Sequence, residues 1–170
     1  MITKPVLGLL LASFIGFSGT VWAQYPADEP EWKESALPPP PAFDVNKLLT
    51  FDVSSNSSLV YGVDPSTIRI SNNDGLVRYV VVATSASGVR NVMYEGIRCS
   101  TGEFKTYARY SPEGRWIVVT DPQWKSMFEN MPSRHALRLA KAGMCDNATL
   151  VSSVNEVVAR LKNPFSKAVN

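Results

Sequence analysis

The chain has little of what most enzyme active sites are built from. Of its 170 residues, one is a histidine and two are cysteines. The sequence contains no GxSxG, GxxxxGK[ST], HExxH, GxGxxG, SxxK or CxxC motif. These motifs form the hydrolase nucleophile elbow, the phosphate-binding loop, the zinc-protease helix, the dinucleotide fold, the serine–lysine pair and the thioredoxin-type thiol pair. The chain therefore carries none of the usual sequence signatures of those enzyme and cofactor-binding classes.

The chain also lacks a charge excess and a long apolar run. Its 17 basic and 15 acidic residues leave a net charge of +2, so there is no general argument for nucleic acid or for an anionic membrane surface. The run VLGLLLASFIGF is shorter than the roughly 20 residues that span a bilayer. Lys4 precedes this run and VWA at 21–23 follows it, a pattern typical of a secretory signal peptide.

We therefore predict a signal peptide over residues 1–23, cleaved after Ala23, with the mature chain beginning at Gln24. The alternative is a retained N-terminal membrane anchor. Cleavage would leave no integral membrane segment and would deliver the protein to the periplasm or outside the cell.

Residues 24–48 form a Pro-rich acidic lead segment. They hold six of the twelve prolines, and five acidic residues against two basic ones. The run PPPP at 38–41 favours polyproline II, because proline restricts its own φ and the residue before it. The lead could be a solvated spacer, a ligand for an aromatic groove, or a segment that lies across its own domain through Trp32 and Phe43. We favour the solvated spacer, because charged Pro-rich segments rarely bury enough surface to become ordered.

From residue 49 the pattern changes to short β-rich runs separated by turn residues. The runs lie at 48–53, 58–63, 66–70, 76–84, 89–99, 103–110 and 115–120. NNDG at 72–75 and SASG at 85–88 are turn signals, because Asn, Asp and Gly tolerate positive φ. We predict a single α+β domain over 49–170, with an antiparallel meander sheet of about six strands and C-terminal helices packed on one face.

Helical patterns appear only towards the C-terminus. We expect a short helical turn over 122–130, and a helix capped by Ser133 that covers HALRLAKAG and ends at Gly143. A last helix is expected from about Thr149 to Leu161. Its apolar residues recur at three- and four-residue steps and should face the sheet; they are Leu150, Val151, Val154, Val157, Val158 and Leu161.

The two cysteines, Cys99 and Cys145, are expected to form a disulfide bridge. An exported chain meets an oxidising compartment, where an isolated pair of cysteines normally joins. The alternative is a reactive Cys99 thiolate beside Arg98. That alternative needs a base, and His135, the one histidine, is expected at the surface or at a helix end.

Strand alternation predicts one candidate binding patch, which is basic and aromatic. If the polar faces of residues 89–99 and 103–110 lie side by side, they gather Tyr94, Arg98, Lys105, Tyr107 and Arg109. Such a surface suits a carboxylate, a phosphate or an anionic polymer, although a solvated sheet face has the same pattern. Arg78 and Glu95 fall among apolar residues, and we expect them to form a buried ion pair.

The stretch VRYVVVATSASGVRNVMYEGIRCSTGEFKTYA resembles the central signature of the cryptic neisserial protein 1-like family, a group of exported proteobacterial proteins. WKESALPPPPAF, VDPSTI, Trp116, Trp124 and the second cysteine also fit, so the resemblance covers most of the mature chain. The resemblance implies an envelope location. It brings no established activity, cofactor or ligand.

These observations together predict an exported periplasmic or cell-envelope protein that acts as a non-catalytic binding or interaction module. Its partner would be an unknown envelope protein or an anionic ligand, with no nucleic acid, cofactor or metal involved. The alternative is an envelope hydrolase that uses a carboxylate such as Glu95.

Overall fold

The computed structural model describes Met1 and residues 31–163. Apart from Met1, the signal peptide expected over 1–23 lies outside the described residues, as do residues 24–30 of the lead segment. Among the helices that the structure describes, none is both long enough and apolar enough to cross a membrane.

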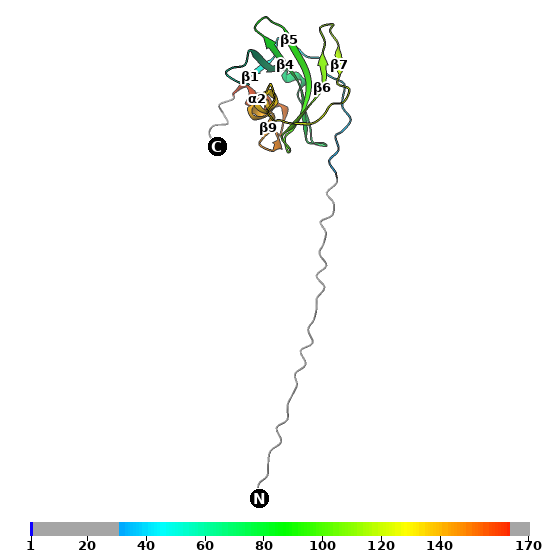
Figure 1. The fold of residues 1–170 in the computed structure, drawn as a ribbon, viewed down its shortest axis with the longest axis vertical. Helices are drawn as coiled ribbons and strands as arrows, with labels where there is room; N and C mark the ends of the chain where they lie inside the picture. Colours follow the sequence, from blue (N-terminus) through cyan, green and yellow to red (C-terminus); the bar gives the residue numbers. More distant parts are fainter. Residues whose placement is uncertain (2–30, 164–170) are drawn as a thin grey trace. The chain divides into compact units, whose positions relative to one another are not determined.

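The domain is built on one antiparallel sheet (Figure 1). Its strands lie in the order β1-β2-β4-β5-β6-β7, with the short strand β3 paired to β4 and β8 paired to β6. Their bounds are β1 (Leu49–Phe51), β2 (Leu59–Val63), β3 (Arg69–Ser71), β4 (Leu76–Ser85), β5 (Arg90–Arg98), β6 (Glu103–Tyr110), β7 (Trp116–Val118) and β8 (Lys125–Ser126). A 3₁₀ turn over Pro65–Thr67 precedes β3. The predicted α+β class with a meander sheet is confirmed.

The turns form where their residues predict them. Residues 72–75 join β3 to β4, and residues 85–88 join β4 to β5. Gly75 and Gly88 adopt φ of 69° and 83°, the left-handed region that glycine enters without strain. These two hairpins place the long strands β4 and β5 at the centre of the sheet.

Both faces of this central region are buried. On the face that we call the helix face, Val77, Tyr79 and Val81 of β4 pack with Leu139 and Val157 from the C-terminal segments. On the opposite face, which we call the strap face because residues 32–43 of the lead lie against it, the packed residues are Val80, Val82, Val92, Tyr94, Tyr107 and Ala108. Burial on both faces explains why β4 is an almost continuous apolar run, because neither side of the strand meets water.

The C-terminal segments differ in detail from the prediction. Helix α1 (His135–Leu139) continues into a wider π turn over Ala140–Met144, and α2 (Val154–Lys162) ends the described chain. Between them β9 (Cys145–Asp146) pairs with β10 (Thr149–Leu150), so the start predicted for the last helix is wrong. Ser153 caps α2 through its Oγ, which accepts from the backbone N–H of Glu156 at 3.2 Å. The helical turn expected over 122–130 is also wrong, because β8 is extended there.

Residues 32–43 of the lead lie against the domain, and we call them the strap. Trp32 Nε1 donates to the carbonyl oxygen of Asp74 at 2.8 Å. At the other end, the ring of Phe43 packs edge-on against Tyr110 and Trp116, with centroid distances of 4.9 and 5.6 Å. The solvated-spacer interpretation is therefore wrong for this part of the lead. Its few aromatic and acidic side chains find apolar and basic partners on the strap face, and the average composition of the segment hides this complementarity.

Candidate functional site

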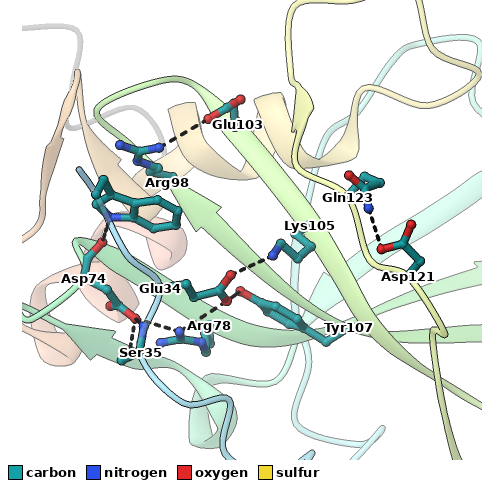
Figure 2. A network of polar contacts seen from close by, with 11 residues as sticks. Glu34, Ser35, Asp74, Arg78, Arg98, Glu103, Lys105, Tyr107, Asp121 and Gln123 are labelled. Atoms are coloured by element: carbon teal, nitrogen blue, oxygen red, sulfur yellow. Dashed lines mark hydrogen bonds and ion pairs between the residues drawn. The ribbon is translucent and has the colours of Figure 1, made fainter.

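The strap carries a carboxylate into the predicted binding patch (Figure 2). Glu34 accepts hydrogen bonds from Lys105 Nζ and from the Tyr107 hydroxyl, each at 2.6 Å. The Glu34 carboxylate also lies 3.5 Å from Arg78 Nη2. Arg78 in turn forms an ion pair of 2.8 Å with Asp74, whose carboxylate accepts from the backbone N–H and the hydroxyl of Ser35.

The charge states of these groups follow from their contacts. Burial raises the pKa of Glu34, but the hydrogen bonds from Lys105 and Tyr107 outweigh it and hold that pKa below its ordinary value of 4.5. Burial together with the Glu34 carboxylate raises the pKa of Tyr107 well above its ordinary value. The pKa of Asp74 is held well below its ordinary value, because hydrogen bonds led by those from Ser35 overcome the effect of its burial. At neutral pH, Glu34 and Asp74 are therefore anionic and Tyr107 is a neutral donor.

Trp32 covers a second basic group of the patch. The guanidinium carbon of Arg98 lies 3.9 Å from the centroid of the Trp32 ring, a cation–π contact. Arg98 also lies 3.8 Å from Glu103, and Lys105 lies 4.7 Å from the centroid of the Trp124 ring. Arg98, Lys105 and Tyr107 are thus all engaged by the strap, and Tyr94 lies buried beside Tyr107.

Arg109 does not share this face, and its expected placement is wrong. Tyr94 pairs with Ala108, but the next residue, Glu95, pairs with Thr106, so Tyr107 is the extra residue of a β-bulge. The bulge reverses the alternation beyond it and places Arg109 opposite Met93, whose side chain packs in the core of the helix face. The predicted patch is therefore divided between the two faces of the sheet, and its role in binding stays a prediction.

The expected ion pair between Arg78 and Glu95 is also wrong. Both residues are buried, but Arg78 pairs in register with Gly96 and points to the strap face, where it meets Asp74 and Glu34. Glu95 pairs in register with Tyr79, so its side chain points to the helix face. A one-residue difference in register separates the two charges across the sheet.

Glu95 instead belongs to a polar network inside the helix face. Its side chain is fully buried, and Oε1 accepts from Thr106 Oγ1 at 2.9 Å. Oε2 accepts from the Tyr79 hydroxyl at 3.2 Å and lies 2.9 Å from His135 Nε2. The other ring nitrogen of His135, Nδ1, lies 3.2 Å from Ser133 Oγ. Each carboxylate oxygen of Glu95 thus has a donor, as a buried charge requires.

These partners assign the proton positions on the His135 ring. A carboxylate only accepts, so Nε2 of His135 carries the hydrogen that faces Glu95. In the neutral imidazole, Nδ1 then accepts from the Ser133 hydroxyl, and Ser133 Oγ accepts from the backbone N–H of His135 at 3.3 Å. Tyr61 stacks on the imidazole with a centroid distance of 5.5 Å and an interplanar angle of 5°, which fixes the ring plane.

The network opens into a pocket of about 500 Å³ between the helix face and the segment that follows β7. Among the residues lining it are Tyr61, Glu95, Thr106, Arg109, Lys125, Ser133 and His135. Arg109 and Lys125 are exposed there, and neither has an ion-pair partner within the part of the chain that the structure describes. Asp121 is the exposed acid of this pocket, and its carboxylate accepts from the side-chain amide of Gln123 at 2.6 Å (Figure 2).

The predicted disulfide bridge is confirmed, because Cys99 is bonded to Cys145. Both cysteines are buried, and they tie the end of β5 to the start of β9. A second pocket of about 590 Å³ lies beside this bridge and is lined mainly by apolar groups such as Met127, Phe128 and Leu137. Among the described residues its lining includes Ser100, Thr101, Lys141 and Asn147 but no acid and no histidine, so the pocket over Glu95, with its buried carboxylate and histidine, is the stronger candidate site.

The sequence reasoning missed His135 and Ser133 as parts of this site. The sequence predicts His135 at the surface or at a helix end; it does stand at a helix end, the start of α1, but it is only 7% exposed and so does not lie at the surface. One signal was available: Glu95 stands in a run of buried strand residues, and a buried carboxylate needs donors. In a chain with one histidine, that residue is a natural partner for such a carboxylate.

A comparison with known families matches residues 27–162 to the CNP1-like family. The match covers most of the chain, so the chain belongs to the CNP1-like family, and the resemblance drawn from its sequence is confirmed. Searches of curated proteins and of solved structures gave no significant match.

Proposed function

We propose that this CNP1-like protein is exported to the cell envelope and binds a small anionic ligand in the pocket over Glu95 and His135. The observation that carries the proposal is the pocket itself. The same pocket is lined by the hydrogen-bonded Glu95 and His135 and by two exposed cations, Arg109 and Lys125, that have no ion-pair partner among the described residues. Concave pockets with a few convergent polar groups are the usual sites of small ligands.

Export is supported by two independent features of the chain. The first residues have the charge and apolar pattern of a signal peptide, and the cysteines are joined as in proteins of oxidising compartments. The test is the intact mass of the protein recovered from the periplasmic fraction, alkylated with and without prior reduction. We expect a chain that begins at Gln24 and takes up label only after reduction. A full-length chain held in the membrane fraction would contradict export.

The ligand site is tested with small carboxylates. We expect citrate, glutarate or N-acetylglutamate to shift the imidazole ¹⁵N signals of the protein, which come from a single histidine if the purification tag contains none. Arg109→Glu should weaken this binding at least about tenfold, because removing a charged partner costs 1.5–3 kcal/mol. Arg90→Glu is the matched control, an exposed arginine of the same sheet that does not line this pocket.

The strap face is the second candidate site, and one observation favours it. Lys105, Tyr107 and Arg78 already hold a carboxylate, that of Glu34, so the geometry suits an anion. An external ligand would have to displace the strap to reach these groups. Lys105→Gln distinguishes the two sites. If the ligand binds in the pocket over Glu95, carboxylate binding should be unchanged in this variant. If the ligand binds on the strap face, carboxylate binding should be abolished.

A further inference from the structure

We propose that Ser133 is a nucleophile and that Ser133, His135 and Glu95 form a relay for acyl transfer from small anionic esters. The proposal rests on the proposed function in one respect, namely that the pocket admits a small ligand. It goes further by assigning a reaction to the pocket and a role to each of the three side chains.

The hydrogen bonds have the connectivity that an activated hydroxyl requires. A nucleophile must contact a base, and the base must be held by a third group. Ser133 Oγ lies 3.2 Å from His135 Nδ1, and His135 Nε2 lies 2.9 Å from Glu95 Oε2. The tautomer assigned from these contacts leaves Nδ1 free of hydrogen, so it can take the proton of the Ser133 hydroxyl.

The three side chains become more exposed along the relay, from Glu95 through His135 to Ser133. Glu95 is fully buried, His135 is 7% exposed, and Ser133 is partly exposed and lines the pocket. Tyr79 and Thr106 hold the carboxylate of Glu95, and Tyr61 stacks on the imidazole, so the relay is set before any substrate arrives. Such preorganisation is what makes an electrostatic partner effective in catalysis.

A local turn explains only half of this arrangement. Ser133 stands two residues before His135, and its Oγ also accepts the backbone N–H of His135, so the turn alone brings these two together. The contact between His135 and Glu95 joins residues 40 apart in the sequence. The Glu95 carboxylate lies in the interior, where an unpaired charge would cost several kcal/mol. The turn around Ser133 does not explain this second contact.

The reaction balances without a cofactor. Ser133 Oγ attacks the ester carbonyl carbon while its proton passes to His135 Nδ1, and the negative charge of Glu95 stabilises the imidazolium through Nε2–H. The bond from carbonyl carbon to the alcohol oxygen then breaks, and the alcohol leaves with the proton from Nδ1. Water attacks the acyl-Ser133 ester by the same route, which releases the acid and restores the hydroxyl. Glu95 acts through His135 and is a positioning residue.

The pocket restricts the class of substrate. A volume of about 500 Å³ suits a small ester rather than a polymer. Arg109 and Lys125 line the same pocket and provide positive charge for an anionic group of the substrate. We therefore assign a small ester that carries a carboxylate or a similar anion.

A fluorophosphonate probe tests the proposal on the whole protein. Serine nucleophiles displace fluoride from this reagent and keep the phosphonyl group, which peptide mass spectrometry locates. We expect the label on Ser133 and none on Ser152, an exposed serine whose hydroxyl contacts the Glu156 carboxylate and which serves as the control. An unlabelled Ser133 in the folded protein, or equal labelling of Ser133 and Ser152, would overturn the proposal.

Two variants test the roles of the other members. His135→Asn should lower the labelling rate by about 10²-fold or more, the usual contribution of a general base. Glu95→Gln should lower the labelling rate and also move the ¹⁵N signals of the one imidazole, because Nε2–H loses its anionic partner. Unchanged labelling in either variant, with circular dichroism showing a folded protein, would refute the relay. If a variant does not fold, labelling of the unaltered protein decides.

Two measurements on the unaltered protein, labelling of Ser133 and carboxylate binding, separate this proposal from the proposed function. Ser133→Ala should lose the label, and carboxylate binding is not judged on this variant because Ser133 itself lines the pocket. Carboxylate binding by the unaltered protein without a label on Ser133 would overturn the relay and leave the binding function standing. Labelling of Ser133 without carboxylate binding would support the nucleophile and remove the proposed ligand class.

Discussion

Glu34→Gln is the sharpest test of the strap, because this one carboxylate faces three groups of the sheet. The substitution keeps the size of the side chain and one carbonyl acceptor, but removes the negative charge that faces Lys105 and Arg78. The Glu34 side chain is 19% exposed, so the loss should be smaller than the 3–5 kcal/mol for breaking a fully buried pair. A hydrogen bond to a charged group contributes about 1.5–3 kcal/mol, and we expect a loss of about 2–3 kcal/mol.

Urea unfolding followed by tryptophan fluorescence measures this loss, and Trp32 on the strap contributes to the signal. The matched control is Glu129→Gln, an exposed glutamate, which should change the free energy of unfolding by no more than about 0.5 kcal/mol. Equal stability of Glu34→Gln and the unaltered protein at neutral pH would refute the conclusion that the strap is bound through Glu34.

The same variant predicts a pH dependence of definite sign. The pKa of Glu34 is lower in the folded chain than its ordinary value of 4.5, so its contribution is complete above about pH 4.5 and is lost as the pH falls through the folded-state value. The difference in stability between Glu34→Gln and the unaltered protein should therefore be constant above that pH and shrink below it. A difference that stays constant down to pH 3 would contradict the ionic role of Glu34.

Three further changes test the fold. Replacing Cys99 and Cys145 together by serine should lower the free energy of unfolding by about 4 kcal/mol in urea, because the bridge spans a sequence separation of 46 residues; a loss below about 1 kcal/mol would contradict this. Gly96→Ala should cost about 1–3 kcal/mol, since its Cβ would lie 2.6 Å from the Tyr107 hydroxyl oxygen, and an unchanged Tm would show that the ring moves freely. Val157→Asp should prevent folding, because it buries an unpaired carboxylate, and a cooperative thermal transition by circular dichroism would argue against this.

The parts of the fold that depend on short-range chemistry could be predicted from the sequence. The turns at 72–75 and 85–88 place β3, β4 and β5 in one antiparallel series, and the apolar periodicity places α2 against the sheet. The start of α2 was misplaced because Leu150 and Val151 extend the apolar stripe. Ser153 and Glu156 have the S-x-x-E spacing of a capping box, a local signal that outweighs the stripe.

The candidate site is harder to predict, because strand register decides which side chains share a face of the sheet. Alternation within residues 103–110 groups Arg109 with Lys105, and nothing in the sequence marks Tyr107 as a bulge residue. The bulge is what brings Arg109 into the pocket over Glu95 and leaves Lys105 to the strap. A prediction from period-two alternation fails beyond any such insertion, because every later side chain changes face.

The partner of Glu95 is hard to predict for the same reason, because it also depends on strand register. Glu95 and Arg78 are both buried, and the sequence alone favours pairing them as the least costly arrangement of two charges. The hairpin at 85–88 sets Glu95 opposite Tyr79, which puts Arg78 on the other side of the sheet. Arg78 then pairs with Asp74 in the turn before β4 and also meets Glu34 of the strap, whereas Glu95 is met by His135 at the start of α1. Each buried charge of the central strands thus contacts a flanking segment, Arg78 the strap on one face and Glu95 the start of α1 on the other.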